Sequence, residues 1–147
     1  MRRTWLYGTA ALLALLGLAD AIYLTVEHVT GQSVRCTIIT GCSEVLSSSY
    51  AVVAGVPLAL IGGAGYFGAF SLATLAVFGY RFAATLLMPL TVAMFLVSLW
   101  LIYLQAFVIH AFCQFCLFSA LITLLLLVVT VGAARPTNAF RGCLFRG

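Results

Sequence analysis

The chain has 147 residues, of which 65% are hydrophobic and only 7% are charged, and its formal net charge is +4. A water-soluble domain of this length could not persist with so few charges, so the composition excludes that class and indicates a protein embedded in lipid. Lysine is absent, so arginines carry the positive charge. We interpret them as markers of membrane orientation and lipid contact, because no basic and aromatic surface suggests a nucleic-acid partner.

Four apolar stretches are long enough to cross a bilayer, which takes about 20 residues of helix. They are continuously apolar rather than alternating, which favours helices over the strands of a barrel. The stretches cover residues 5–26, 52–78, 83–109 and 112–131, and one long polar loop covers 27–51. The sequence therefore predicts an all-α integral membrane protein, a four-transmembrane-helix bundle that forms a single domain over residues 1–147.

The first stretch has a second interpretation, as a cleavable signal peptide. Arg2 and Arg3 precede it, and Ala19-Asp20-Ala21 resembles a cleavage site flanked by small residues. However, the apolar run continues to residue 26 and is longer than a signal core of about 7 to 15 residues. We therefore favour a membrane span.

Arginine placement predicts how the bundle is oriented, because basic residues that flank membrane helices stay on the cytoplasmic side. The arginines that would share one face are Arg2, Arg3, Arg81, Arg135, Arg141 and Arg146. Only Arg35 falls on the opposite face. We expect both termini in the cytoplasm and the long loop outside.

Small and ionisable residues within the stretches have two interpretations each. The second stretch contains Gly55, Gly62, Gly63, Gly65 and Gly68, which favour close helix packing over direct ligand contact. Asp20 lies within the first stretch, where an ionisable side chain is expensive and marks a functional site by default. A hydrogen bond from Asp20 to a neighbouring helix explains it equally well.

Two cysteine pairs carry the chemistry. Cys113 and Cys116 form a CxxC motif at the start of the fourth stretch, where the motif and the helix amino terminus both stabilise a thiolate. Cys36 and Cys42 lie six positions apart in the long loop. The predicted orientation puts both pairs on the outer face, where disulfides persist. Cys143 falls on the inner face and is predicted to be a free thiol outside any relay.

Other uses of these cysteines fit less well. Haem attachment needs CxxCH, but Leu117 occupies the histidine position. A zinc site is disfavoured because five residues separate Cys36 from Cys42, beyond the usual two to four. Inert buried cysteines are the general alternative, and the gathering of two pairs at one face disfavours them. We favour a relay of two electrons between dithiols, with a lipid-soluble quinone beside Cys116 as the acceptor.

The residues also match a known family. The chain resembles prokaryotic members of the vitamin K epoxide reductase family in Cys36, in the run 42–48 (CSEVLSS), in the later CxxC and in the segment 17–25 (GLADAIYLT). This resemblance implies a four-helix bundle around a quinone of the ubiquinone or menaquinone type, in the cell membrane of a prokaryote. It also implies that Cys116 is the thiol nearest the quinone ring and that Cys113 is its partner.

The resemblance further assigns roles in the loop. Cys42 would exchange with Cys113, and the pair of Cys36 and Cys42 would take electrons from a reduced partner protein. Ser48, rather than Ser47, matches a serine that hydrogen-bonds near the quinone, although helix capping or turn formation is the other interpretation. Many prokaryotic relatives carry a fused thioredoxin-like domain, whereas this chain ends in a short arginine-bearing tail. We therefore expect a separate thioredoxin-like or DsbA-like partner, and disulfide formation rather than epoxide reduction.

Two rival functions remain. A DsbB-type protein would have similar chemistry, but its CxxC pair belongs in the first outer loop, the reverse of the order here. A non-catalytic membrane protein, such as a transporter component or a metal-binding protein, would use the cysteines as structural disulfides. His110, three residues before Cys113, could stabilise a thiolate or shuttle a proton, although an interfacial histidine is more often simply solvated.

Overall fold

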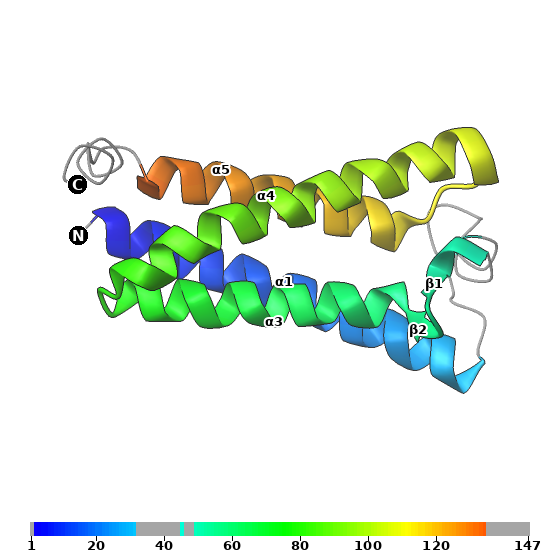
Figure 1. Cartoon of the computed structure of the whole chain (residues 1–147), viewed down its shortest axis with the longest axis horizontal. Coiled ribbons are helices and arrows are strands. Elements are labelled where there is room, and N and C mark those ends of the chain that lie inside the picture. The colour runs from blue at the N-terminus through cyan, green and yellow to red at the C-terminus, as the bar shows by residue number, and fades with distance from the viewer. Residues whose placement is uncertain (1, 32–44, 46–48, 135–147) are drawn as a thin grey trace, which may run out of the picture.

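A computed structural model of the chain describes residues 2–31, 45 and 49–134 (Figure 1). Within these residues, four helices are long and apolar enough to cross a membrane. They are α1 (Arg2–Thr30), α3 (Leu58–Val77), α4 (Arg81–Leu104) and α5 (Gln114–Ala134). The predicted all-α bundle of four spans is therefore confirmed.

The predicted start of the second span at residue 52 is wrong. A 3-10 turn, η1 (Ser49–Ala51), leads into two short strands, β1 (Val52–Val53) and β2 (Val56–Pro57), which pair antiparallel. Ala54 and Gly55 between them both have positive φ, 53° and 82°, as a tight type I′ hairpin turn requires. Hydropathy could not separate this hairpin from α3 because its valines are as apolar as the helix.

The other bounds also differ from the prediction. Helix α1 continues beyond residue 26 to Thr30, into the segment expected to be loop, and ends at Gly31 with a φ of 66°. After α4 the chain continues in a π-helical turn, η2 (Gln105–Ile109), and His110 then adopts a left-handed conformation with a φ of 53°. Helix α5 starts at Gln114, later than the predicted residue 112, because an apolar sequence alone does not reveal this break.

Figure 1 shows α1 running beside α3 and α4 beside α5, with the two termini at one end of the bundle. The turn between α3 and α4 lies at that same end. The hairpin and the start of α5 lie at the opposite end, together with η2. The CxxC motif and the hairpin that follows the long loop thus share one end of the molecule.

Small side chains pack the core near the end with the termini. Lipid tails give apolar helices no net drive to associate, so close approach of backbones supplies the attraction. The buried core residues are Ala10, Ala14, Ala21, Tyr66, Ala69, Ala73, Leu87, Ile122 and Leu126. Of the second-span glycines, Gly63 lies against Ala21 of α1, whereas Gly65 and Gly68 face side chains of α4. The interpretation of these three as packing residues agrees with the structure.

The tightest approach between α1 and α3 occurs at Gly17, which the sequence analysis named only as part of the segment 17–25. A Cβ atom at this position would overlap the ring of Tyr66. The ring cannot move freely, because Tyr66 is buried and its hydroxyl donates to the Ser119 carbonyl at 3.0 Å. The same hydroxyl lies 2.7 Å from the Ser119 Oγ. Tyr66 thus joins α3 to α5 and requires a glycine on α1.

The Gly17→Ala substitution is expected to destabilise the bundle by about 1–3 kcal/mol, the usual cost of overpacking a filled core. The measurement is thermal unfolding of the purified protein in detergent, followed by circular dichroism. Gly8→Ala is the matched control on the same helix, since a Cβ there would meet nothing within 4 Å. Equal stability of the two variants would contradict the assigned contact.

Candidate functional site

The CxxC motif caps the amino terminus of α5. The backbone N–H of Leu117 donates to the carbonyl of Cys113 at 3.1 Å, so Cys113 is the N-cap residue and Cys116 lies in the first turn. Both cysteines carry free thiols, and Cys113 is buried whereas Cys116 is partly exposed. The predicted position at a helix start is therefore correct, and the two thiols differ in their access to surroundings.

Hydrogen bonds stabilise a negative charge on Cys113. The Cys116 thiol donates to its sulfur, and the backbone N–H groups of Cys116 and Phe115 add weaker bonds. Burial and the charge of Asp20 act in the opposite direction. The balance lowers the pKa of Cys113 from 9.0 to about 7, so a large share of this thiol is ionised near neutral pH.

Gln105, a residue that the sequence analysis missed, joins both cysteines. It is buried at the first position of η2, and its Oε1 accepts a hydrogen bond from the backbone N–H of Cys113 at 2.9 Å. Its side chain also hydrogen-bonds Cys116. The available signal was a lone amide in an otherwise apolar span, because a polar side chain in that setting needs a partner.

A residue of the long loop covers Cys113. Val45 is buried together with Leu24 of α1 and Ala111, and these side chains form one cluster with Cys113. Val45 follows Cys42 by three positions in the sequence. Val45 is thus a described loop residue that packs against the CxxC motif.

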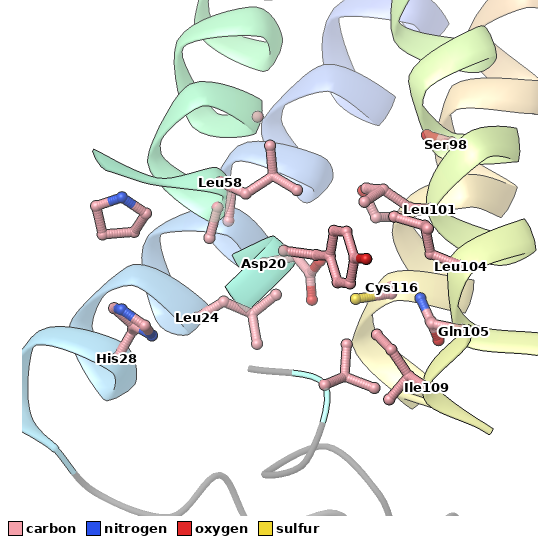
Figure 2. Close-up of a pocket in the computed structure, with 17 residues that line it drawn as sticks. Asp20, Leu24, His28, Leu58, Ser98, Leu101, Leu104, Gln105, Ile109 and Cys116 are labelled. Carbon is pink, nitrogen blue, oxygen red and sulfur yellow. The ribbon is translucent and has the colours of Figure 1, made fainter. Parts of the chain in front are cut away.

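A cavity of about 110 Å³ opens beside Cys116 (Figure 2). Its walls come from α1 and α3 on one side and from α4, η2 and α5 on the other. Most lining side chains are apolar, and the polar ones are Asp20, His28, Tyr50, Ser98, Gln105, Cys116 and Ser119. An apolar cavity with a few polar groups is the usual construction of a small-molecule site.

The structure brings together only some of the residues selected from the sequence. Asp20 lines the cavity with Cys116, while His110 is exposed and does not line it. His28, at the membrane edge of α1, does line the cavity. The residues proposed from the sequence that lie outside the described part of the chain are Cys36, Cys42, Ser47, Ser48 and Cys143.

Comparison with known proteins agrees with the dithiol chemistry of this site. A model of the vitamin K epoxide reductase family matches residues 9–131. The Thiol-disulfide oxidoreductase LTO1 of Arabidopsis thaliana is 54% identical over 44 residues, which are 29% of this chain. That match covers only 12% of the length of the plant protein.

Alkylation of Cys113 in the reduced protein is expected to rise with pH through a midpoint near 7, because the thiolate reacts and the thiol does not. Cys116→Ala removes the strongest of the stabilising hydrogen bonds, so its midpoint should move up toward 9.0. The measurement is the pH dependence of iodoacetamide labelling, read by mass spectrometry of the Cys113 peptide under a phosphine reductant. Burial slows labelling at every pH, so the midpoint rather than the rate is compared. An unchanged midpoint in Cys116→Ala, with Ser119→Ala as the control on the same helix, would contradict this account.

Gln105→Leu is expected to lower the free energy of unfolding by about 1–3 kcal/mol, because it leaves the buried N–H of Cys113 without an acceptor. Thermal unfolding in detergent measures the loss. Ser71→Ala provides the control, since the Ser71 hydroxyl donates at 2.9 Å to the Phe67 carbonyl of its own helix. A Gln105→Leu protein as stable as the control would show that the hydrogen bond to Cys113 does not stabilise the break before α5.

Proposed function

The chain belongs to the vitamin K epoxide reductase family, and from this premise we propose that it is a membrane thiol oxidoreductase that couples disulfide formation in a partner protein to reduction of a quinone. One observation carries the proposal. The free CxxC dithiol caps α5 with one thiol polarised toward thiolate and the other open to an apolar cavity. A dithiol in this setting can undergo disulfide exchange at Cys113, and it can give up an electron pair to an acceptor in the cavity beside Cys116.

The proposed reaction begins at the loop cysteines. A thiolate of Cys42 attacks the sulfur of Cys113 in the Cys113 to Cys116 disulfide, which forms a mixed disulfide and releases Cys116. Cys36 then attacks Cys42, closes the loop disulfide and releases Cys113. The lowered pKa of Cys113 makes it a good leaving group in this second step.

The position of Val45 supports this order of exchange. Three residues of extended chain span at most about 11 Å, and Val45 packs in the cluster that contains Cys113. A chain link of this length is compatible with the proposed attack of Cys42 on Cys113. Cys116 lines the cavity, and so does Val45.

The cavity residues fit a quinone. Leu58, Leu101 and Leu104 offer apolar surface for a flat ring, while the amide group of Gln105 offers a hydrogen-bond donor for its oxygens. When bound, a quinone of the ubiquinone or menaquinone type supplies a lipid-soluble acceptor of two electrons and two protons. Ser48 is proposed as a further donor on the family resemblance.

We expect the electron donor to be a thioredoxin-like or DsbA-like protein on the outer side of the membrane, which the loop pair Cys36 and Cys42 would oxidise. The disulfide made in that partner is the product of the reaction. The reduced loop pair then passes its electrons to the CxxC motif.

Removal of either CxxC thiol tests the proposal. Cys113→Ala and Cys116→Ala are each expected to lower dithiothreitol-driven reduction of a short-chain quinone by more than about 100-fold, because no other group can hand over the electron pair. Quinone absorbance in detergent measures the rate. Cys143→Ala is the control and should keep the wild-type rate. Wild-type activity in both CxxC variants would overturn the proposal.

The loop pair requires a separate measurement. Cys36→Ala and Cys42→Ala are expected to lose oxidation of a reduced DsbA-like protein while dithiothreitol still drives quinone reduction, since the small reductant reaches the CxxC motif directly. Loss of both activities would show that the loop cysteines act in a different way.

A further inference from the structure

Asp20 is a second reactive group in the cavity that the proposed reaction has not used. It lies within the span formed by α1 and lines the same cavity as Cys116. Figure 2 shows the two side chains reaching into the cavity from opposite walls, Asp20 from α1 and Cys116 from α5. The negative charge of Asp20 acts on both CxxC cysteines.

The surroundings of Asp20 argue against a purely structural role. An ionisable residue inside a span is costly and is normally paired with another polar group. Within residues 2–31, 45 and 49–134, no side chain forms a hydrogen bond or ion pair with this carboxylate. The hydrogen bond to a neighbouring helix, the alternative open from the sequence, is therefore absent from the described part of the chain, and the carboxylate faces the cavity.

The chemistry of the site needs a proton acceptor at this position. When Cys113 is a thiolate and Cys116 a thiol, closing their disulfide releases two electrons and one proton, and the proton comes from Cys116. The nearby walls are leucines, and hydroxyl or amide groups such as those of Ser98 and Gln105 do not take up a proton near neutral pH. A carboxylate within reach directly or through one water molecule can.

We propose that Asp20 accepts the proton of the Cys116 thiol as the Cys113 to Cys116 disulfide closes, and that it delivers this proton to the acceptor in the cavity. The inference rests on the proposed function. Disulfide closure oxidises the two cysteines by two electrons, which reduce the quinone. Of the two protons that the quinol needs, one passes from Cys116 through Asp20, and the other comes from solvent.

Other titratable groups face Asp20 and define its setting. Tyr66 of α3 feels its charge, as do the CxxC cysteines before and within α5. His28 lies about two turns further along α1, and Tyr50 of η1 lines the cavity. The part of α4 that lines the cavity offers Ser98 and leucines. Asp20 is thus the carboxylate that the cavity presents to Cys116.

Infrared difference spectroscopy tests the proton transfer without a quinone. The reduced, quinone-free protein is oxidised electrochemically, and the carbonyl stretch of a protonated carboxyl group is followed. The band is expected to appear on oxidation of the wild type, to shift in heavy water, and to be absent in Asp20→Asn and in Cys116→Ala. Glu27→Gln is the matched control on α1 and should keep the band. If the band is absent from the wild type or persists in Asp20→Asn, the inference is overturned.

Kinetics supply the second readout. Asp20→Asn should slow single-turnover quinone reduction by about 100-fold or more, the usual contribution of a positioned acid or base, while reduction of its CxxC disulfide by dithiothreitol stays unchanged. Asp20→Glu should restore the rate and move the infrared band, which keeps the assignment testable if the asparagine variant fails to fold. A wild-type rate in Asp20→Asn would contradict the proposed role.

The two proposals can fail separately. If the wild type reduces no quinone, the proposed function is wrong, but the infrared band still reports whether Asp20 takes the proton of Cys116. If quinone reduction is normal and no Asp20 band appears, only the role of Asp20 is wrong.

Discussion

The hydrogen bond from the Cys113 N–H to Gln105 holds the site together. A helix leaves its first N–H groups without partners, and at the edge of a bilayer such groups must be satisfied by the protein. Here Gln105 satisfies the N–H of Cys113, and the sulfur of Cys113 accepts from the N–H groups of Phe115 and Cys116. The reactive thiol is itself the helix cap. The backbone N–H groups of Phe115 and Cys116 stabilise the negative charge on its sulfur, and the same N–H groups need a hydrogen-bond acceptor because they lie in the first turn of α5.

This cap depends on the irregular chain between α4 and α5. Had α4 continued without a break, Cys113 would lie inside a helix, where the following N–H groups bond to backbone carbonyls and not to its sulfur. The π-helical turn and the left-handed His110 end α4, and the chain between them and α5 carries Cys113 to the amino terminus of the new helix. Gln105, at the start of that turn, reaches across it to the backbone of Cys113. The break is thus a condition for the lowered pKa.

Different packing at the two ends explains where the cavity beside Cys116 forms. Toward the termini, alanines such as Ala10, Ala14 and Ala73 bring the helices into direct contact. At the other end the facing residues include Leu58, Leu101 and Leu104, whose longer side chains line an open space. Ser119 also lines this space and bonds to Tyr66, so the hydrogen bond between α3 and α5 lies beside the cavity. The ring of Tyr66 leaves no room for a Cβ atom at position 17, so the closest contact between α1 and α3 depends on Gly17.

Hydropathy and spacing were enough to predict the four spans and the position of CxxC at a helix start, because both follow from local sequence. They could not predict the hairpin at Val52, since strand and helix valines are equally apolar. Nor could they predict Gln105, whose partner is a backbone group brought near by a π-helical turn. The sequence also could not predict which side of the helix carries the Asp20 side chain. An apolar span has no polar face, so the rotation of the helix about its axis cannot be inferred from the sequence. The roles of Cys36, Cys42 and Ser48 remain predictions.

The two thiols of the CxxC motif differ in burial, because Cys113 is buried and Cys116 is partly exposed. Cys113 is buried in one cluster with Val45, so a folded partner protein has no direct access to its sulfur while that residue is in place. Cys42 stands three positions before Val45 in the sequence, and the proposal makes it the cysteine that reaches this sulfur. Cys116 meets the cavity instead, where the electron pair and the proton can leave together. Within the proposed reaction, electrons therefore enter from the partner protein through the loop pair and leave through the cavity, and the partner protein is expected to react with the loop pair rather than with the CxxC motif.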